Sequence, residues 1–198
     1  VRAVSYSLAS GGSETERRRQ ALSDFRTLLQ LGANSICVER KDQGPFLSRL
    51  CDRFGILMFE RGGLEGQDLL VCAWDGAVAI RWGEEGQGER VPAYRGDSDA
   101  FFLAHRKCPT ALYYKYKARW SEEPFVYLAP ESVRRLRSGN YTVTCYSSCG
   151  RVALYTDGEL FEFRKGDGEF VFQEVPARTP CIMLAAEGDG CSGALSVH

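Results

Sequence analysis

Apolar residues recur with one period in the first part of this chain and with another in the last part. Before residue 60 they fall three or four positions apart in some stretches, as at Leu22, Phe25, Leu28 and Leu29, and form short continuous runs in others. After residue 140 they alternate with polar residues. The first pattern is typical of helices between buried strands, and the second of half-buried strands. The sequence therefore predicts an α/β unit followed by an all-β unit.

Three strands separated by two helices are predicted for the first unit. Ser13 and Glu16 form a capping box that begins one helix, and Gly32 ends it. Pro45 begins the second helix and Gly55 ends it. This alternation implies parallel strands covered by helices, with any site at the carboxyl ends of the strands. The predicted strands are Ala3–Leu8, Asn34–Val38 and Ile56–Glu60.

Short strands joined by tight turns are predicted for the last unit. Asp157-Gly158 is typical of a two-residue hairpin, and residues 166–168 mark another turn. Tyr141, Val143 and Cys145 share one face of the first strand. Such even spacing describes an antiparallel sandwich, whose edges we expect to be charged. The further strands are expected around Val152 and Leu154 and at Leu160–Phe163, Phe170–Val175 and Ile182–Ala186, the last of the chain.

The stretch Ala111–Leu128 joins these two kinds of structure. Thr110 can cap a short helix that ends at Trp120, and a strand begins near Phe125. We therefore expect an α/β domain over residues 1–120 and a β-sandwich over residues 121–198.

Charge and composition argue against nucleic acid and membranes as partners. The 25 basic and 26 acidic residues nearly balance, so no broad basic field favours nucleic acid or an anionic membrane. No apolar run approaches the roughly 20 residues that span a bilayer. No signal peptide is recognisable in a chain that begins at Val1 rather than Met.

The eight cysteines are scattered, and most lie in apolar runs where a reduced thiol packs as a small hydrophobic group. Their distribution favours a reducing, cytoplasmic compartment. Only Cys145 and Cys149 are close in sequence, and with two histidines in the chain this spacing is poor evidence for zinc. We expect neither a metal nor a cofactor.

Three sets of residues resemble family 2 glycoside hydrolases of the β-galactosidase kind. The first set is Tyr113–Ser121 followed by Pro124-Phe125-Val126. The second is the pair Leu31–Ile36 and Leu50–Leu57. The third is Tyr146–Cys149 with Val152–Tyr155 and Asp157–Glu159. The resemblance implies a (β/α) barrel that runs into an immunoglobulin-like sandwich. Residues 77–82 are similar to the eighth barrel strand, and residues 99–107 to part of the loop after it. The fold expected is thus a partial barrel, with strands resembling the first three and the eighth, before the sandwich.

The same resemblance implies that the catalytic residues are missing. Retaining glycosidases use two carboxylates roughly 5–5.5 Å apart. In the family these glutamates come from the fourth and seventh strands, and the first of them follows an Asn. The two asparagines here, Asn34 and Asn140, precede Ser and Tyr. Strands four to seven therefore have no counterpart. Asp75-Gly76, between the apolar runs Leu69–Trp74 and Ala77–Trp82, also fits a hairpin turn, which competes with reading these two runs as one barrel strand and its loop.

Four residues are candidates for contact with a sugar: Arg40, Glu60, Glu65 and Trp74. The lining is altered, because Cys37 stands where the family has Arg, and Gly66-Gln67 where it has His-Gly. Trp82 fits core packing better than a sugar platform. A working acid pair among the remaining carboxylates would need a raised pKa and a closed barrel, so we assign no catalytic residue.

Two hypotheses of function remain. The chain is either a glycoside hydrolase relative or fragment that is inactive alone, or a non-catalytic carbohydrate-binding or assembly module. The second would use Trp74 and the loop around Glu84. Carbohydrate is the expected ligand in either case, and the sandwich the expected surface for any oligomer.

Overall fold

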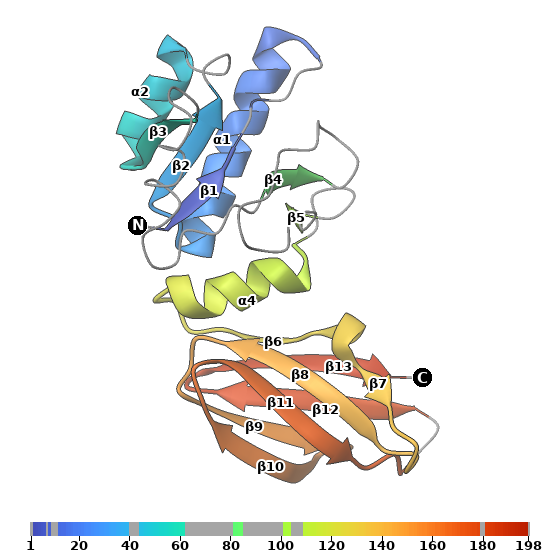
Figure 1. Ribbon diagram of the computed structural model, residues 1–198. Coiled ribbons are helices and arrows are strands. Elements are labelled where there is room, and N and C mark those ends of the chain that lie inside the picture. Colours follow the sequence, from blue (N-terminus) through green and yellow to red (C-terminus); the bar gives the residue numbers. More distant parts are fainter. Residues whose placement is uncertain are drawn as a thin grey trace. The chain divides into compact units, whose positions relative to one another are not determined.

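The computed structural model describes residues 2–6, 8, 12–39, 44–61, 81–84, 101–103, 109–178 and 181–197 (Figure 1). The chain divides into two compact units, Val1–Tyr113 and Tyr114–His198. This division lies within a helix, α4 (Ala111–Trp120), whereas the sequence analysis placed the domain boundary after its last residue.

The described strands of the first unit form one parallel sheet in the order β3-β2-β1-β4-β5. The predicted strand–helix–strand–helix–strand order is confirmed; the first strand begins at the predicted Ala3 but ends three residues early, and the boundaries of the other two are shifted by one residue. The elements are β1 (Ala3–Ser5), α1 (Glu14–Leu31), β2 (Ser35–Glu39), α2 (Pro45–Phe54), β3 (Leu57–Arg61), β4 (Arg81–Glu84) and β5 (Phe101–Leu103).

Helix α1 begins and ends at the predicted residues. The Ser13 hydroxyl accepts a hydrogen bond from the Glu16 N–H, and the Glu16 carboxylate accepts one from the Ser13 N–H, which satisfies donors that the first helical turn leaves unpaired. Gly32 ends the helix at a φ of 86°, a left-handed conformation that favours glycine. The buried face consists of Ala21, Phe25, Leu28 and Leu31.

One predicted core residue of α1 is on the wrong side. Leu29 is 43% exposed, because it lies about 100° around the helix axis from Leu28, at the outer edge of the buried stripe. Phe25 packs against Tyr6 and Phe54, with ring centroids 5.7 Å away in both cases. Helix α2 supplies Phe54 and ends at Gly55, as predicted.

The region after β3 departs from expectation in two places. A strand was predicted over residues 77–82, but the observed strand, β4, begins at Arg81, four residues later than predicted. It pairs with β1 through Ser5 and Arg81. Residues 101–103, expected in a loop, form β5 beside β4. Aromatic residues favour strands, and this sequence, Phe-Phe-Leu, finds a parallel neighbour. Asp75-Gly76 lies outside the described residues.

The described strands of the second unit form two antiparallel sheets, β10-β9-β12-β13 and β11-β8-β6, with β7 also paired to β8 (Figure 1). A helix, α4, precedes them, and the Thr110 hydroxyl accepts from the Tyr113 N–H near its first turn. The elements are β6 (Val126–Leu128), the 3-10 turn η3 (Pro130–Ser132), β7 (Arg134–Arg135), β8 (Tyr141–Ser147), β9 (Arg151–Thr156), β10 (Glu159–Lys165), β11 (Gly168–Val175), β12 (Ile182–Gly188) and β13 (Cys191–Val197).

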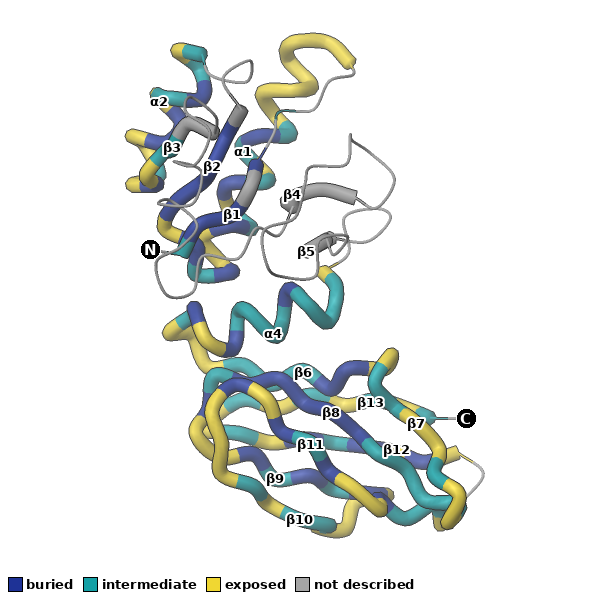
Figure 2. Tube along the Cα trace, in the orientation of Figure 1, coloured by how far each residue is buried: buried dark blue, intermediate teal, exposed yellow. Residues whose placement is uncertain are grey.

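The sandwich core lies between these sheets, and Figure 2 shows buried positions along β8 and β12. The predicted face of Val143 and Cys145 is confirmed, since both are fully buried and Tyr141 packs against them. Asp157 and Gly158, with φ of 50° and 86°, form the predicted turn. The core cluster comprises Leu128, Val143, Cys145, Val152, Leu154, Phe170, Phe172, Val175, Ile182, Leu184 and Ala186.

Two predictions for the sandwich were wrong. Ile182–Ala186 is not its last strand, because β13 follows and pairs along the whole of β12. Its sequence, CSGALSV, is small and weakly apolar, so it carries little strand signal. The edges are also not uniformly charged: β13 has no charged residue, and Leu160 and Phe163 of β10 are 54% and 59% exposed.

Two glycines allow the sheets to approach closely. A Cβ atom on Gly193 would lie 3.0 Å from the Val126 carbonyl oxygen, and one on Gly188 would lie 3.1 Å from the Val126 side chain. Strand β6 therefore packs directly over β12 and β13 at this end of the sandwich.

Candidate functional site

The carboxyl edge of the parallel sheet is where the sequence places the sugar-contacting residues. The backbone of Glu60 lies in β3 opposite Val38 of β2, one residue before the end of each strand. Arg40 is the next residue of the chain after β2. Arg40, Glu65 and Trp74, and the side chain of Glu60, lie outside what the structure describes. Their predicted contact with a sugar stays a prediction.

Two described side chains lie on or just after the strands that end at this edge. Cys37, which stands where the family has Arg, lies within β2 between Ser5 and Phe59 and is 9% exposed. Tyr6, just after β1, is buried, and its hydroxyl donates to the Asp24 carboxylate of α1 at 3.1 Å.

The described carboxylates do not provide a recognisable proton donor. Hydrogen bonds from Ser13 lower the pKa of Glu16, and bonds from Ser138 and Asn140 lower that of Glu174. A glycosidase acid needs the opposite shift, which burial in an apolar site produces. Among the described residues, no three His, Cys, Asp or Glu side chains are grouped so that they could share a metal ion.

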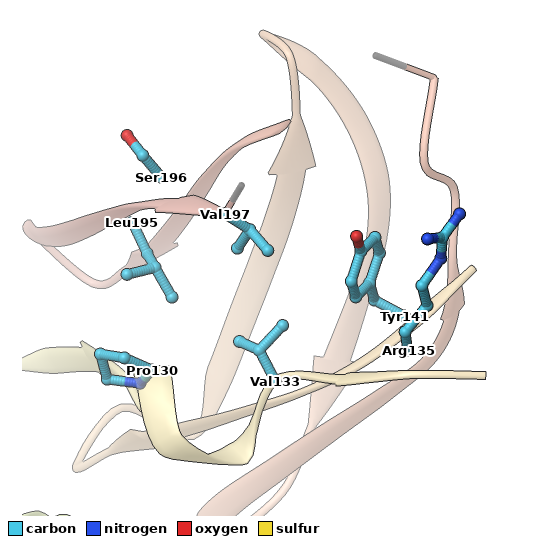
Figure 3. A pocket seen from close by; sticks show the side chains of 7 residues that line it. All are labelled: Pro130, Val133, Arg135, Tyr141, Leu195, Ser196 and Val197. Carbon is cyan, nitrogen blue, oxygen red and sulfur yellow. The ribbon is translucent and has the colours of Figure 1, made fainter. Parts of the chain in front are cut away.

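A shallow pocket of about 450 Å³ in the sandwich was not predicted (Figure 3). It lies between the β7–β8 side of one sheet and β13 of the other. The sequence analysis missed it because it ended the sandwich one strand early, at β12, and so had no second wall. The lining residues are Pro130, Val133, Arg135, Tyr141, Leu195, Ser196 and Val197.

The pocket combines an apolar floor with a polar rim. Figure 3 shows Val133 in the middle, Pro130 and Leu195 to one side, and Tyr141 and Arg135 to the other. Arg135 and Tyr141 are directly opposed in the β7–β8 pairing, and Arg135 is exposed. Within the described part of the chain, Arg135 has no carboxylate partner. The arrangement suits a ligand with an apolar ring face and an acidic group, which an Arg fork can bind through two hydrogen bonds.

None of the described helices is both apolar enough and long enough to cross a membrane.

A scan against protein-family models found no match, and a search of curated proteins found no relative. Solved structures do match. β-Glucuronidase 2 of Bacteroides uniformis, covalently bound to a cyclophellitol-6-carboxylate aziridine, has a TM-score of 0.63 at 12% identity over 100% of this chain and 45% of that one. β-Glucuronidase 3 of the same organism has a TM-score of 0.62 at 12% identity, covering 98% and 48%. The β-glucuronidase of Parabacteroides merdae has a TM-score of 0.60 at 11% identity, covering 98% and 47%.

The chain spans less than half the length of each of these structures. At such identities the likeness concerns the fold alone. The chain therefore shares its fold, a helix-bearing and largely β structure, with glycoside hydrolases of the β-glucuronidase kind at low sequence identity.

Proposed function

We propose that this chain is a scaffold portion of a β-glucuronidase- or β-galactosidase-like glycoside hydrolase, and that it does not cleave glycosides by itself. The observation that carries the proposal is the fold match, which covers the whole chain but only 45% of the β-glucuronidase it matches.

The order of the parallel strands supports a barrel origin for the first unit. In a (β/α)₈ barrel the eighth strand lies beside the first, parallel to it. Strand β4, which overlaps the residues that resemble an eighth strand, pairs in parallel with β1, while β2 and β3 follow on its other side. The order β3-β2-β1-β4 is the one that a barrel shortened between its third and eighth strands would have, whereas β5, beside β4, has no counterpart in that scheme.

The sequence supports the lack of activity. In the family that the sequence resembles, one catalytic Glu follows an Asn. Neither Asn of this chain is followed by a Glu, because Asn34 precedes Ser35 and Asn140 precedes Tyr141. A second carboxylate within about 5.5 Å, and a packed site that raises one pKa, are also required for retaining hydrolysis. Glu60, Glu65, Glu84 and Glu85 are the acids that the sequence places near the expected mouth.

Activity measurements test the proposal directly. The purified chain, incubated with nitrophenyl β-galactoside and nitrophenyl β-glucuronide, is expected to release no more nitrophenol than buffer alone. A β-glucuronidase assayed in parallel is the positive control. Hydrolysis that disappears in Glu60→Gln or Glu65→Gln, but persists in Glu131→Gln of the sandwich, would overturn it.

A second candidate function, carbohydrate binding, is favoured by the sandwich pocket. Its apolar floor and the exposed Arg135 fit a sugar ring that carries a carboxylate, such as a glucuronide. This site differs from the Trp74 and Glu84 region proposed from sequence.

Calorimetry separates the two binding sites. Titration with a glucuronide should give a signal that is lost in Arg135→Ala and kept in Arg151→Ala, an exposed Arg of β9 outside the pocket lining. A signal lost in Trp74→Ala instead would favour the sequence-based site. A flat titration at millimolar ligand would leave assembly as the role of the module.

A further inference from the structure

Two cysteines distant in sequence meet in the sandwich. The Sγ atoms of Cys149 and Cys191 are 3.5 Å apart, although 42 residues separate them. Cys149 lies two residues after the end of β8, which belongs to one sheet. Cys191 is the first residue of β13, which belongs to the other. A bond between these sulfurs would join the two sheets.

The surroundings hold the Cys149 thiol beside its partner. Gly188 and Cys191 are directly opposed in the β12–β13 pairing. A Cβ atom on Gly188 would lie 2.7 Å from the Cys149 sulfur and 3.0 Å from its Cβ, so the thiol occupies the space that a side chain at 188 would need. The Cys149 N–H donates to the Ser147 hydroxyl at 3.0 Å, which anchors the backbone.

We propose that Cys149 and Cys191 are a redox modification site, at which a low-molecular-weight disulfide oxidises the two thiols to a disulfide between the sheets. The sulfurs must approach by about 1.5 Å from their present contact to reach the bonded distance of about 2.05 Å. Side-chain torsions can supply a movement of this size.

The reaction proceeds by thiol–disulfide exchange in two steps. Cys191, which is half-exposed while Cys149 is buried, attacks the small disulfide as a thiolate and releases one small thiol. The Cys149 thiolate then attacks the Cys191 sulfur of this mixed disulfide and releases the second small thiol. The two protons and two electrons lost by the protein are thus gained by the oxidant.

A third thiol, Cys145, lies near this pair but differs from it. Cys145 is fully buried, and its sulfur lies 3.8 Å from the Tyr146 carbonyl oxygen, to which it can donate. Burial raises its pKa to about 12, while burial and the contact with Cys149 raise that of Cys191 to about 11. Both thiols are protonated near neutral pH. Exchange through Cys191 therefore speeds up by nearly tenfold per pH unit until its pKa is approached.

The test uses the full chain and oxidised glutathione at mildly alkaline pH. Peptide mapping without reduction should find the segment of Cys149 bonded to that of Cys191, with a mass lower by two hydrogen atoms. The melting temperature of the sandwich should rise on the order of 10 °C, because the bond closes a long loop of the unfolded chain. A reductant should reverse both changes.

Variants distinguish this pairing from other oxidations. Cys191→Ser and Cys149→Ala should abolish the cross-link and the thermal shift, while Cys181→Ser, which removes an exposed cysteine of the same sandwich, should keep both. Cys191→Ser should melt like the reduced parent, because residue 191 is half-exposed. A Cys145–Cys149 cross-link, or glutathione that stays on Cys191 of a folded chain, would overturn the proposal.

Discussion

The two units bury their strands in different ways. Each sheet of the sandwich has one face against the other sheet, and eleven buried residues of the cluster lie between them. The sheet of the first unit is parallel, and β2 is buried along its length, from Ser35 to Val38. Among the described strands, β3 pairs with β2 alone and β5 with β4 alone. Each sheet of the sandwich covers one face of the other, whereas parallel sheets are usually covered on both faces by helices.

This difference bears on function. Chemistry in a (β/α) barrel takes place where all its strands end, so an incomplete ring cannot position groups from opposite sides of the mouth. A sandwich can retain a binding pocket or an interface without the rest of the enzyme. The scaffold or binding role proposed above assumes such an incomplete ring.

The largest expected effect tests whether the two units unfold separately. Phe172→Ala in the sandwich and Phe25→Ala in α1 each remove a fully buried ring and should each cost about 3–5 kcal/mol of unfolding free energy. Denaturant unfolding followed by probes in each unit should show each variant shifting its own transition.

The control for this pair is Phe163→Ala, whose ring is 59% exposed and which should change stability by less than about 0.5 kcal/mol. A single transition shifted equally by both core variants would show that the units unfold as one, and would remove the distinction between them.

Hydrogen exchange should separate the units under native conditions. Amides of β8 and β12 should open with higher free energies than those of the parallel sheet, whose strand β3 pairs with β2 alone among the described strands. Mass spectrometry of exchanged peptides measures this. Equal protection in β2 and β8 would mean that the parallel sheet is as well supported as the sandwich.

A smaller effect tests the close contact between the two sheets. Gly193→Ala should destabilise the sandwich by about 1–3 kcal/mol, because the added methyl group would meet the Val126 carbonyl oxygen at 3.0 Å. Gly150→Ala is a matched control, since a Cβ there meets nothing within 4 Å. Equal melting temperatures for the two variants would show that β6 can move aside.

The smallest effect concerns the capping box of α1. Ser13→Ala should cost about 1 kcal/mol near neutral pH. Because Ser13 lowers the pKa of Glu16 below its ordinary value of 4.5, the part due to the carboxylate is present above pH 4.5 and lost as the pH falls through the lowered value. The gap between parent and variant should narrow in acid, whereas Ser23→Ala, on the exposed side of α1, should give no such pH-dependent gap.

Prediction from sequence succeeded where the signal was local. The capping box at Ser13, the glycine stops at Gly32 and Gly55, and the turn at Asp157-Gly158 each depend on a few neighbouring residues. It failed where a strand forms only because a neighbouring strand pairs with it. Strands β5 and β13 have short or weakly apolar sequences, and they pair with β4 and β12. The predicted sugar contacts remain untested, and the sandwich pocket could not be foreseen without β13.

The sequence by itself determined the helices and most of the strands, though not β5 and β13, because helix caps, turn residues and the period of apolar positions act over a few residues. Only the tertiary structure decided which distant residues meet. The contact of Cys149 with Cys191, the approach of Val126 to Gly193 and the pocket between Tyr141 and Leu195 all arise from stacking two sheets. Such contacts depend on strand register and sheet packing, and these are set by the whole core rather than by any one segment.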